Sequence, residues 1–293
     1  MAGVPGSNPG ATIPGSPAGL APPASIWHAA GCAMGRLWEY RRFVLGMARR
    51  EFEQRYLGSA LGSLWVVLNP LAMILVYTVV FGQIMRHRLP GLDDGLSYGL
   101  FLCAGLLPWG MFTEILQRQA GIFRDEGNLI RKMSFPRSTL PAIVVVTASI
   151  NFAVTMGVLV VLLLVTGRFP GWVFLGFVPL ALLQQLLAVG LGVGLGVVNV
   201  FFRDIGHIVG IAVQYWFWFT PIVYPIGVLP EWAQSLLMLN PMTGVVAGYQ
   251  GILLEGEWPP LLPLLPAALL AVAGLFASRA VYRRLAPEMP DFL

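Results

Sequence analysis

Long stretches without charged residues alternate with short basic segments along most of this 293-residue chain. Seven such stretches are present, at residues 64–85, 98–113, 139–167, 169–202, 205–230, 232–254 and 258–278. Most of them reach the roughly 20 apolar residues that a helix needs to cross the hydrocarbon core of a bilayer. The pattern therefore predicts an all-α integral membrane protein.

The stretch 232–254 differs from the others because Asn240-Pro241 and Gly244 interrupt it. A proline removes a helical hydrogen bond and ends or bends the helix. Each remaining helical piece has about a dozen residues, which is too few to span a bilayer and is typical of a re-entrant or interfacial hairpin. We therefore expect six transmembrane helices within 59–285, with an outer hairpin before the last one.

The distribution of basic residues supports the same count. With six spans and both termini in the cytoplasm, 15 of the 18 Lys and Arg residues lie on the cytoplasmic side, where membrane proteins concentrate these residues. A seventh span would move Arg279, Arg283 and Arg284 to the outside. The expected location is the cytoplasmic (inner) membrane, with a short cytoplasmic tail at 286–293.

The segment before the first stretch divides into two parts. Residues 1–24 contain six prolines, no charged residue and no apolar periodicity; because such a composition buries too little surface to stay ordered, we expect a disordered tail at 1–33. Residues 34–58 instead repeat apolar residues at helical spacing, with Arg42, Arg49 and Glu53 on the other face. This predicts an amphipathic interface helix in contact with cytoplasmic-leaflet lipids, although a helix packed on a soluble partner has the same pattern.

Two cytoplasmic segments carry charges suited to a protein partner. In the segment 121–141 acids come first, bases follow and a proline ends the run, which predicts a short helix. A second segment is a short turn near residue 203. Solvated loops with the usual positive charge have the same pattern. The candidate contact residues are Arg124, Asp125, Glu126, Asn128, Arg131, Arg203 and Asp204.

Glu114 is the single acidic residue inside a predicted span, and Arg118 lies one helical turn beyond it. An ionisable group inside a membrane is a functional hypothesis, although such a pair also neutralises itself near a helix end. Carriers coupled to ions or protons usually need several such groups at membrane depth. Secondary transport is therefore disfavoured.

Two further patterns lie within the spans. Small residues at GxxxG spacing allow close helix approach within a subunit or between two copies; they are Gly190, Gly192, Gly194 and Gly196.

An aromatic run at 215–219 covers every side of its helix, because successive residues are ~100° apart. Part of it can line a sugar-conducting path, although an aromatic belt at the membrane interface has the same composition. The conduit candidates are Trp109, Phe112, Tyr215, Trp216, Trp218 and Phe219.

Composition and motifs argue against several other classes. Charged residues make up 11% of the chain, against roughly 25% in an ordinary soluble domain, and no dense basic tract for nucleic acid is present. Cys32 and Cys103 give neither a disulfide framework nor a metal-ligand spacing. No catalytic motif or phosphate-binding loop occurs, and Lys132 is the only lysine. We expect neither an enzyme nor a metal or cofactor bound by this chain.

An ordered set of short motifs runs through residues 34–285. It comprises Arg50-Glu-Phe-Glu-Gln-Arg-Tyr56, Asn69-Pro70, Lys132-Met-Ser-Phe-Pro136-Arg137, Phe202-Arg203-Asp204-Ile-Gly206 and Thr220-Pro221-Ile-Val-Tyr224-Pro225. This set resembles the permease subunits of type 2 ABC exporters. More narrowly, it is similar to the branch that exports O-antigen, capsule and teichoic acid polysaccharides.

The resemblance implies a homodimer of six-helix subunits joined by two copies of a separate cytoplasmic ATPase, which binds ATP and magnesium. It implies that 121–141 is a coupling helix, that the turn at Arg203 and Asp204 makes a second ATPase contact, and that 232–254 is an outer gate. The implied substrate is a lipid-linked polysaccharide. No Lys or Arg lies deep in a span, which favours a neutral or mixed glycan.

Two alternatives to this function remain open from the sequence. The first is a type 2 ABC exporter permease for drugs or lipids. The second, from another class, is a membrane-embedded enzyme that modifies glycans. Such an enzyme needs acids or histidines at the outer face, and the available residues are His87, Asp93, Asp94, Glu231, Glu255 and Glu257.

Overall fold

The computed structural model describes residues 40–54, 62–81, 95–127 and 139–292. This part of the chain consists of helices and their connections and contains no β-strand, which confirms the all-α class. Several predicted features lie outside the described residues: the tail at 1–33, both ends of the interface helix, and the candidate contact residues Asn128 and Arg131.

The helices follow one another with short connections. The first half of the chain contains α2 (Arg41–Gln54), η1 (Gly62–Leu64), α3 (Trp65–Leu75), its π-helical continuation η2 (Val76–Phe81), α5 (Gly95–Asp125) and α7 (Thr139–Val165). The second half contains η3 (Gly171–Gly176), α8 (Phe177–Phe201), α9 (Ile205–Trp218), η4 (Ile226–Val228), α10 (Glu231–Leu237), α11 (Pro241–Leu254), η5 (Leu262–Leu264), α12 (Leu265–Leu285) and α13 (Met289–Phe292).

Four helical segments of the described chain are long and apolar enough to cross a membrane: Leu96–Asp125, Thr139–Val165, Gly171–Phe201 and Leu262–Leu285. The helices α10 and α11 pass as a fifth span only if they are taken together, and a 99° bend separates them. This bend falls at Asn240-Pro241, where the sequence predicts the interruption. The helix formed by α3 and η2 is apolar but shorter. Length and composition thus give four to five candidate spans.

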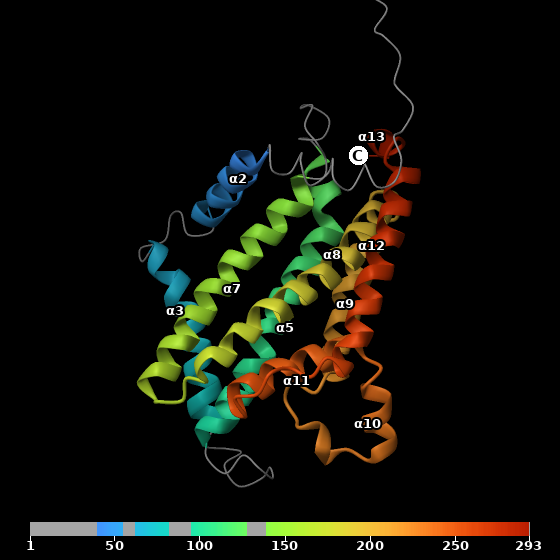
Figure 1. Cartoon of the computed structure of the whole chain (residues 1–293). Coiled ribbons are helices and arrows are strands. Elements are labelled where there is room, and N and C mark those ends of the chain that lie inside the picture. Colours follow the sequence, from blue (N-terminus) through green and yellow to red (C-terminus); the bar gives the residue numbers. More distant parts are fainter. Residues whose placement is uncertain (1–39, 55–61, 82–94, 128–138, 293) are drawn as a thin grey trace, which may run out of the picture.

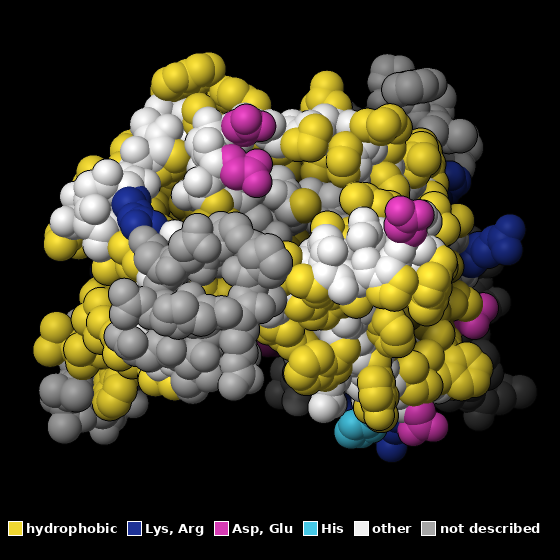
Figure 2. All heavy atoms as spheres, turned by 90° about the horizontal axis from the view of Figure 1, so that it is seen from below, with side chains coloured by type: hydrophobic (Ala, Val, Ile, Leu, Met, Phe, Trp, Pro, Cys, Tyr) yellow, Lys and Arg dark blue, Asp and Glu magenta, His cyan; other side chains and the backbone are white. Residues whose placement is uncertain are grey.

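The long helices lie side by side, and α8 packs between α5 and α12. The helices α2 and α13 lie at one end of this bundle, hereafter the α2 end, whereas α10 lies at the opposite end (Figure 1). Arg283 and Arg284 in the last turn of α12 also belong to the α2 end. Seen from the α10 end, the surface is largely hydrophobic, with scattered acidic side chains (Figure 2).

Close packing of α8 depends on glycines that face its two neighbours. A Cβ atom at Gly190 would lie 2.9 Å from the carbonyl oxygen of Ala271 in α12. A Cβ atom at Gly196 would overlap the main-chain carbonyl oxygen of Gln119 in α5. Gly194 faces α12 and Gly192 faces α5 in the same way. All four glycines therefore bring helices together within one subunit.

The apolar face of α2 packs in part on the bundle itself. Val44 and Ala48 are buried, and Val44 belongs to a hydrophobic cluster with Ile143 of α7. On the exposed side, Arg49 donates a hydrogen bond to Glu53 at 2.7 Å. The apolar face of α2 thus packs against the bundle of its own subunit, in addition to any contact that it makes with lipid or a soluble partner.

The helix α5 extends further than the sequence pattern indicated. Residues 121–125, the start of the segment predicted as a short helix, form the last turn of α5, and residues 128–138 of that segment lie outside the described residues. No proline interrupts the chain between Thr113 and Asp125, so the helix continues past the end of its apolar stretch. Its 31 residues give a length of about 46 Å, which exceeds the ~30 Å hydrocarbon core.

Candidate functional site

Charged side chains project from the α2 end of the bundle at two places. Arg124 and Asp125 are exposed in the last turn of α5, and Glu126 follows as a half-buried residue. Arg203 and Asp204 are exposed in the turn that joins α8 to α9. These five candidate contact residues are therefore accessible, wholly or in part, to a partner at this end.

The buried side chain of Asn199 connects these two places. Its amide nitrogen donates a hydrogen bond to the carbonyl oxygen of Ala120, close to the end of α5, at 2.8 Å. Its amide oxygen accepts a hydrogen bond from the main-chain N–H of Gly206, in the first turn of α9, at 3.1 Å. One buried amide therefore links the end of α5 to the start of α9.

An ion-pair network joins α2, α5 and α7. Arg118 of α5 pairs with Glu51 of α2 and, at 3.5 Å, with Glu114. Asn151 of α7 donates hydrogen bonds to both carboxylate oxygens of Glu114, at 3.1 and 3.3 Å. Thr147, also of α7, donates one to Glu51 at 3.2 Å. The predicted pair of Glu114 and Arg118 is therefore one part of a larger network that holds α2 on the bundle.

The same network borders a cavity between α3, α5 and α7. The cavity has a volume of about 270 Å³, and Glu114, Asn151 and Asn69 provide polar groups in an otherwise mostly apolar lining. A single water molecule needs only about 10–15 Å³ of such volume. The cavity therefore has room for water beside the Glu114 carboxylate.

The aromatic run of α9 has two faces. Tyr215, Trp218 and Phe219 are each more than 60% exposed, whereas Trp216 and Phe217 are half-buried. Steps of ~100° per residue put the three exposed rings on one side of the helix. This exposed aromatic face, defined by Tyr215, Trp218 and Phe219, is available to a substrate, to lipid or to a second subunit.

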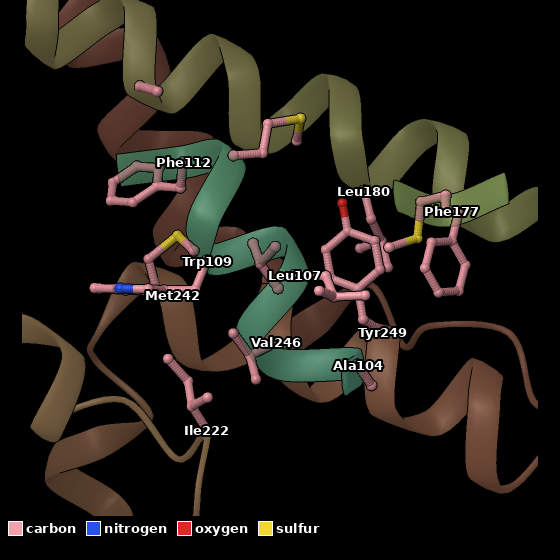
Figure 3. Close-up of a cluster of buried hydrophobic side chains, with 14 of the residues drawn as sticks. Ala104, Leu107, Trp109, Phe112, Phe177, Leu180, Ile222, Met242, Val246 and Tyr249 are labelled. Carbon is pink, nitrogen blue, oxygen red and sulfur yellow. The ribbon is translucent and has the colours of Figure 1, made fainter. Parts of the chain in front are cut away.

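The other aromatic conduit candidates lie inside the subunit. Trp109 and Phe112 of α5 are buried, and their ring centroids lie 6.2 and 5.3 Å from that of Trp216. Figure 3 shows Trp109 and Phe112 in a cluster of hydrophobic side chains with Met242 and Val246 of α11. In this arrangement the three inner rings pack α9 against α5.

Asn240 connects the end of the aromatic run to the bend between α10 and α11. Its amide oxygen accepts hydrogen bonds from the indole N–H of Trp216 at 2.8 Å and from the main-chain N–H of Met242 at 3.0 Å. The second of these bonds caps the N-terminus of α11. Its amide nitrogen donates to the carbonyl oxygen of Phe219 at 2.8 Å and to the hydroxyl of Thr220 at 3.0 Å. One side chain thus fixes the bend against the end of α9.

Comparison with known proteins assigns this helical arrangement to a family. Residues 43–254, more than half of the chain, match the family model described as ABC-2 type transporter. The chain belongs to this family. As an ABC-2 transporter subunit it is the membrane component of a transporter and not an enzyme.

Several curated permeases are similar to this ABC-2 permease over most of their length. The O-antigen export system permease protein RfbA of Myxococcus xanthus is 34% identical, over 87% of this chain and 96% of that protein. A protein of the same name from Klebsiella pneumoniae is 30% identical, over 72% and 79% of the two chains. The polysialic acid transport protein KpsM of Escherichia coli is 27% identical, over 80% and 90%.

The sequence did not single out Glu51, Asn151 and Asn199 of the permease as organising residues, and it identified Asn240 only as an interruption. Three of these four are lone polar residues in apolar stretches, and a buried polar group needs a hydrogen-bond partner. That signal identifies the residue but not its partner, which for Asn199 lies 79 residues away. Within the described residues, no group of three or more His, Cys, Asp or Glu side chains is arranged to hold a metal ion.

Proposed function

We propose that this permease is the transmembrane subunit of an ATP-driven ABC exporter that moves a lipid-linked polysaccharide of the O-antigen type across the cytoplasmic membrane. The similarity to the O-antigen export permease of Myxococcus xanthus carries this proposal, because it extends over nearly the whole of both chains. No Lys or Arg lies deep in a predicted span. This absence suits a neutral or mixed glycan better than a strongly anionic one.

The proposed topology has six spans per subunit: α3 with η2, α5, α7, η3 with α8, α9, and α12. The helices α10 and α11 have 7 and 14 residues, or about 10 and 21 Å. The 99° bend between them favours a re-entrant hairpin at the outer face. Both termini are then cytoplasmic, and α2 lies at the cytoplasmic leaflet together with Arg283 and Arg284.

The complete exporter in this proposal contains two copies of the permease and two copies of a cytoplasmic ATPase, which supplies the sites for ATP and Mg²⁺. The α2 end of the bundle is the docking surface for the ATPase. The exposed charges of Arg124 and Asp125 and those of Arg203 and Asp204 suit such a contact, because they project from the same end. Glu126, Asn128 and Arg131 complete the proposed coupling segment.

The hydrogen bonds of Asn199 and Asn240 support a route for the motion. When ATP binding closes the ATPase pair, a push on the end of α5 reaches Asn199 and then Gly206 at the start of α9. At the other end of α9, Asn240 holds Trp216 and Phe219. A shift of α9 therefore moves the exposed aromatic face and the hairpin together, as rigid packed elements do. We propose that this movement opens a path on which sugar rings stack.

A deletion strain tests this function. Cells without the permease should lose the polysaccharide from their surface and retain it, still linked to its lipid, on the cytoplasmic side. The full-length chain supplied on a plasmid should restore it. Surface glycan is measured by antibody or lectin staining of intact cells and by electrophoresis of the extracted lipid-linked glycan. Unchanged surface glycan in the deletion strain would contradict the proposed function.

A further inference from the structure

A second cavity lies beside the hairpin, and we name it the hairpin pocket. It has a volume of about 380 Å³ and lies between α11, the segment 221–227 that follows α9, and the connection 255–263 between α11 and α12. Small-molecule sites typically have volumes of roughly 300–1,000 Å³. The side chains that matter for recognition are Thr243, Gln250, Glu255, Glu257 and Trp258.

The wall of the hairpin pocket contains a hydroxyl group without a partner. Thr243 lines the pocket and is only 1% exposed, and its hydroxyl makes no hydrogen bond within the described part of the chain. A buried hydroxyl left unpaired is costly, and such groups usually have a partner. A threonine hydroxyl both donates and accepts. The Thr243 hydroxyl in the pocket wall thus suits a hydrogen bond with a hydroxyl group of a ligand.

The rim of the hairpin pocket carries uncompensated negative charge. Glu255 and Glu257 are exposed and follow the C-terminus of α11, where the helix dipole adds partial negative charge. Neither carboxylate forms an ion pair with a described basic residue. Figure 2 shows acidic side chains at this end among mainly hydrophobic ones, with a few basic side chains on the same view. The rim therefore attracts hydrogen-bond donors and repels anions.

An aromatic ring completes the lining. Trp258 is 46% exposed, and its ring lies 5.5 Å from that of Trp172, which limits its rotation. From α11 the lining includes Gly244, Gly248 and Gly251, and Gly244 and Gly248 let α11 approach Pro263 and Pro259 of the connection to α12 closely. The amide nitrogen of Gln250 donates to the carbonyl oxygen of Pro221 at 3.3 Å, which ties α11 to the segment after α9.

We propose that the hairpin pocket binds one sugar unit of the exported glycan, either neutral or amine-bearing. A sugar ring has an apolar C–H face that packs on Trp258, and hydroxyl groups that donate to Glu255 and Glu257 and pair with Thr243. A carboxylated or phosphorylated sugar is disfavoured, because its charge would meet the acidic rim. This inference rests on the proposed function, because it assigns the substrate of that function a subsite at the hairpin.

Binding of a glycan fragment to the purified complex of permease and ATPase tests the pocket. The probe is the lipid-free glycan released by mild acid from the same cells, cut to short fragments and fluorescently labelled, and binding is measured by equilibrium dialysis. Glu257→Gln should weaken binding about tenfold, because it removes the charge that strengthens the bond from a sugar hydroxyl. Thr243→Val should weaken it about fivefold, because it removes a hydrogen bond. Thr243→Ser keeps the hydroxyl and should bind like the wild type.

Glu231→Gln is the matched control, because Glu231 is an exposed acid in the first turn of α10 and does not line the pocket. Weaker binding in both pocket variants, with normal binding in this control and in Thr243→Ser, supports the inference. Equal affinities in all variants, or no binding by the wild type, would overturn it. The deletion strain separates the two proposals: if surface glycan depends on the permease while pocket variants bind normally, only the pocket is refuted.

Discussion

Asn199 on α8 donates a hydrogen bond to the carbonyl oxygen of Ala120 on α5 at 2.8 Å. The donor is buried and also accepts from the main-chain N–H of Gly206. A single amide therefore links three helices at the end of the molecule where the proposed ATPase contacts project. Because both bonds are to main-chain groups, the link does not depend on which side chains the partner segments carry.

Replacement of Asn199 by Leu should break this link. The change leaves the N–H of Gly206 unpaired and removes the tie to the carbonyl of Ala120, which should cost about 1–3 kcal/mol of stability and lower export per ATP hydrolysed. The measurements are the thermal unfolding midpoint of the solubilised permease and the ATPase activity of the full complex. Gln214→Leu, at an exposed position on α9, is the control. An Asn199→Leu complex with normal coupling would show that force reaches α9 by another route.

Charge reversal at the end of α5 tests the proposed ATPase contact. Asp125→Lys combined with Glu126→Lys should reduce the amount of ATPase that co-purifies with the permease, while the permease itself still inserts into the membrane. Glu231→Lys changes an exposed acid in the first turn of α10, at the opposite end of the bundle, and should leave co-purification unchanged. Normal ATPase recovery with the double variant would make this segment a solvated loop.

Cysteine labelling tests the six-span topology. In a variant without Cys32 and Cys103, a single cysteine is introduced at Glu257 or at Arg284 and treated with a membrane-impermeant maleimide in intact spheroplasts. The Glu257 position should react and the Arg284 position should not, because α12 separates them. Labelling at Arg284 before the cells are opened would rule out the proposed orientation of α12.

The two faces of the aromatic run should respond differently to substitution. Alanine at Tyr215, Trp218 or Phe219 should lower surface glycan with little change in stability, because these rings are exposed. Alanine at Trp216 should lower stability by about 2–4 kcal/mol, because this ring packs on Trp109 and Phe112. Surface glycan at matched protein level and the unfolding midpoint separate the two effects. Equal, small losses at all positions would make the exposed face a lipid belt.

The glycines of α8 should tolerate no larger residue. Gly196→Ala forces the new methyl group onto the carbonyl oxygen of Gln119 and should cost about 1–3 kcal/mol. Gly157→Ala in α7 is the control, because a Cβ atom there meets nothing within 4 Å and alanine favours the helix. Unfolding midpoints of the two variants should therefore move in opposite directions. A stable Gly196→Ala variant would mean that α5 and α8 separate easily.

The helical class, the long apolar helices and the bend at Asn240-Pro241 followed from sequence, because each depends on residues close together in the chain. The extension of α5 to Asp125 did not, because its polar last turn has the composition of a loop. The sequence also cannot show that Trp216 faces inward and Trp218 outward, since every residue of the run is aromatic. Asn199 and Glu51 bond to helices far along the chain, and only the packing of those helices identifies their partners.

The contacts of Glu51 also concern the order in which the protein assembles. Glu51 is synthesised long before Thr147, which lies 96 residues later. At translation rates of about 5–20 residues per second, α7 is therefore synthesised roughly 5–20 s after α2. During that interval a helix with an apolar face needs a temporary location, and the membrane surface provides one for amphipathic helices. The amphipathic pattern of α2 thus serves the nascent chain first and the finished permease second.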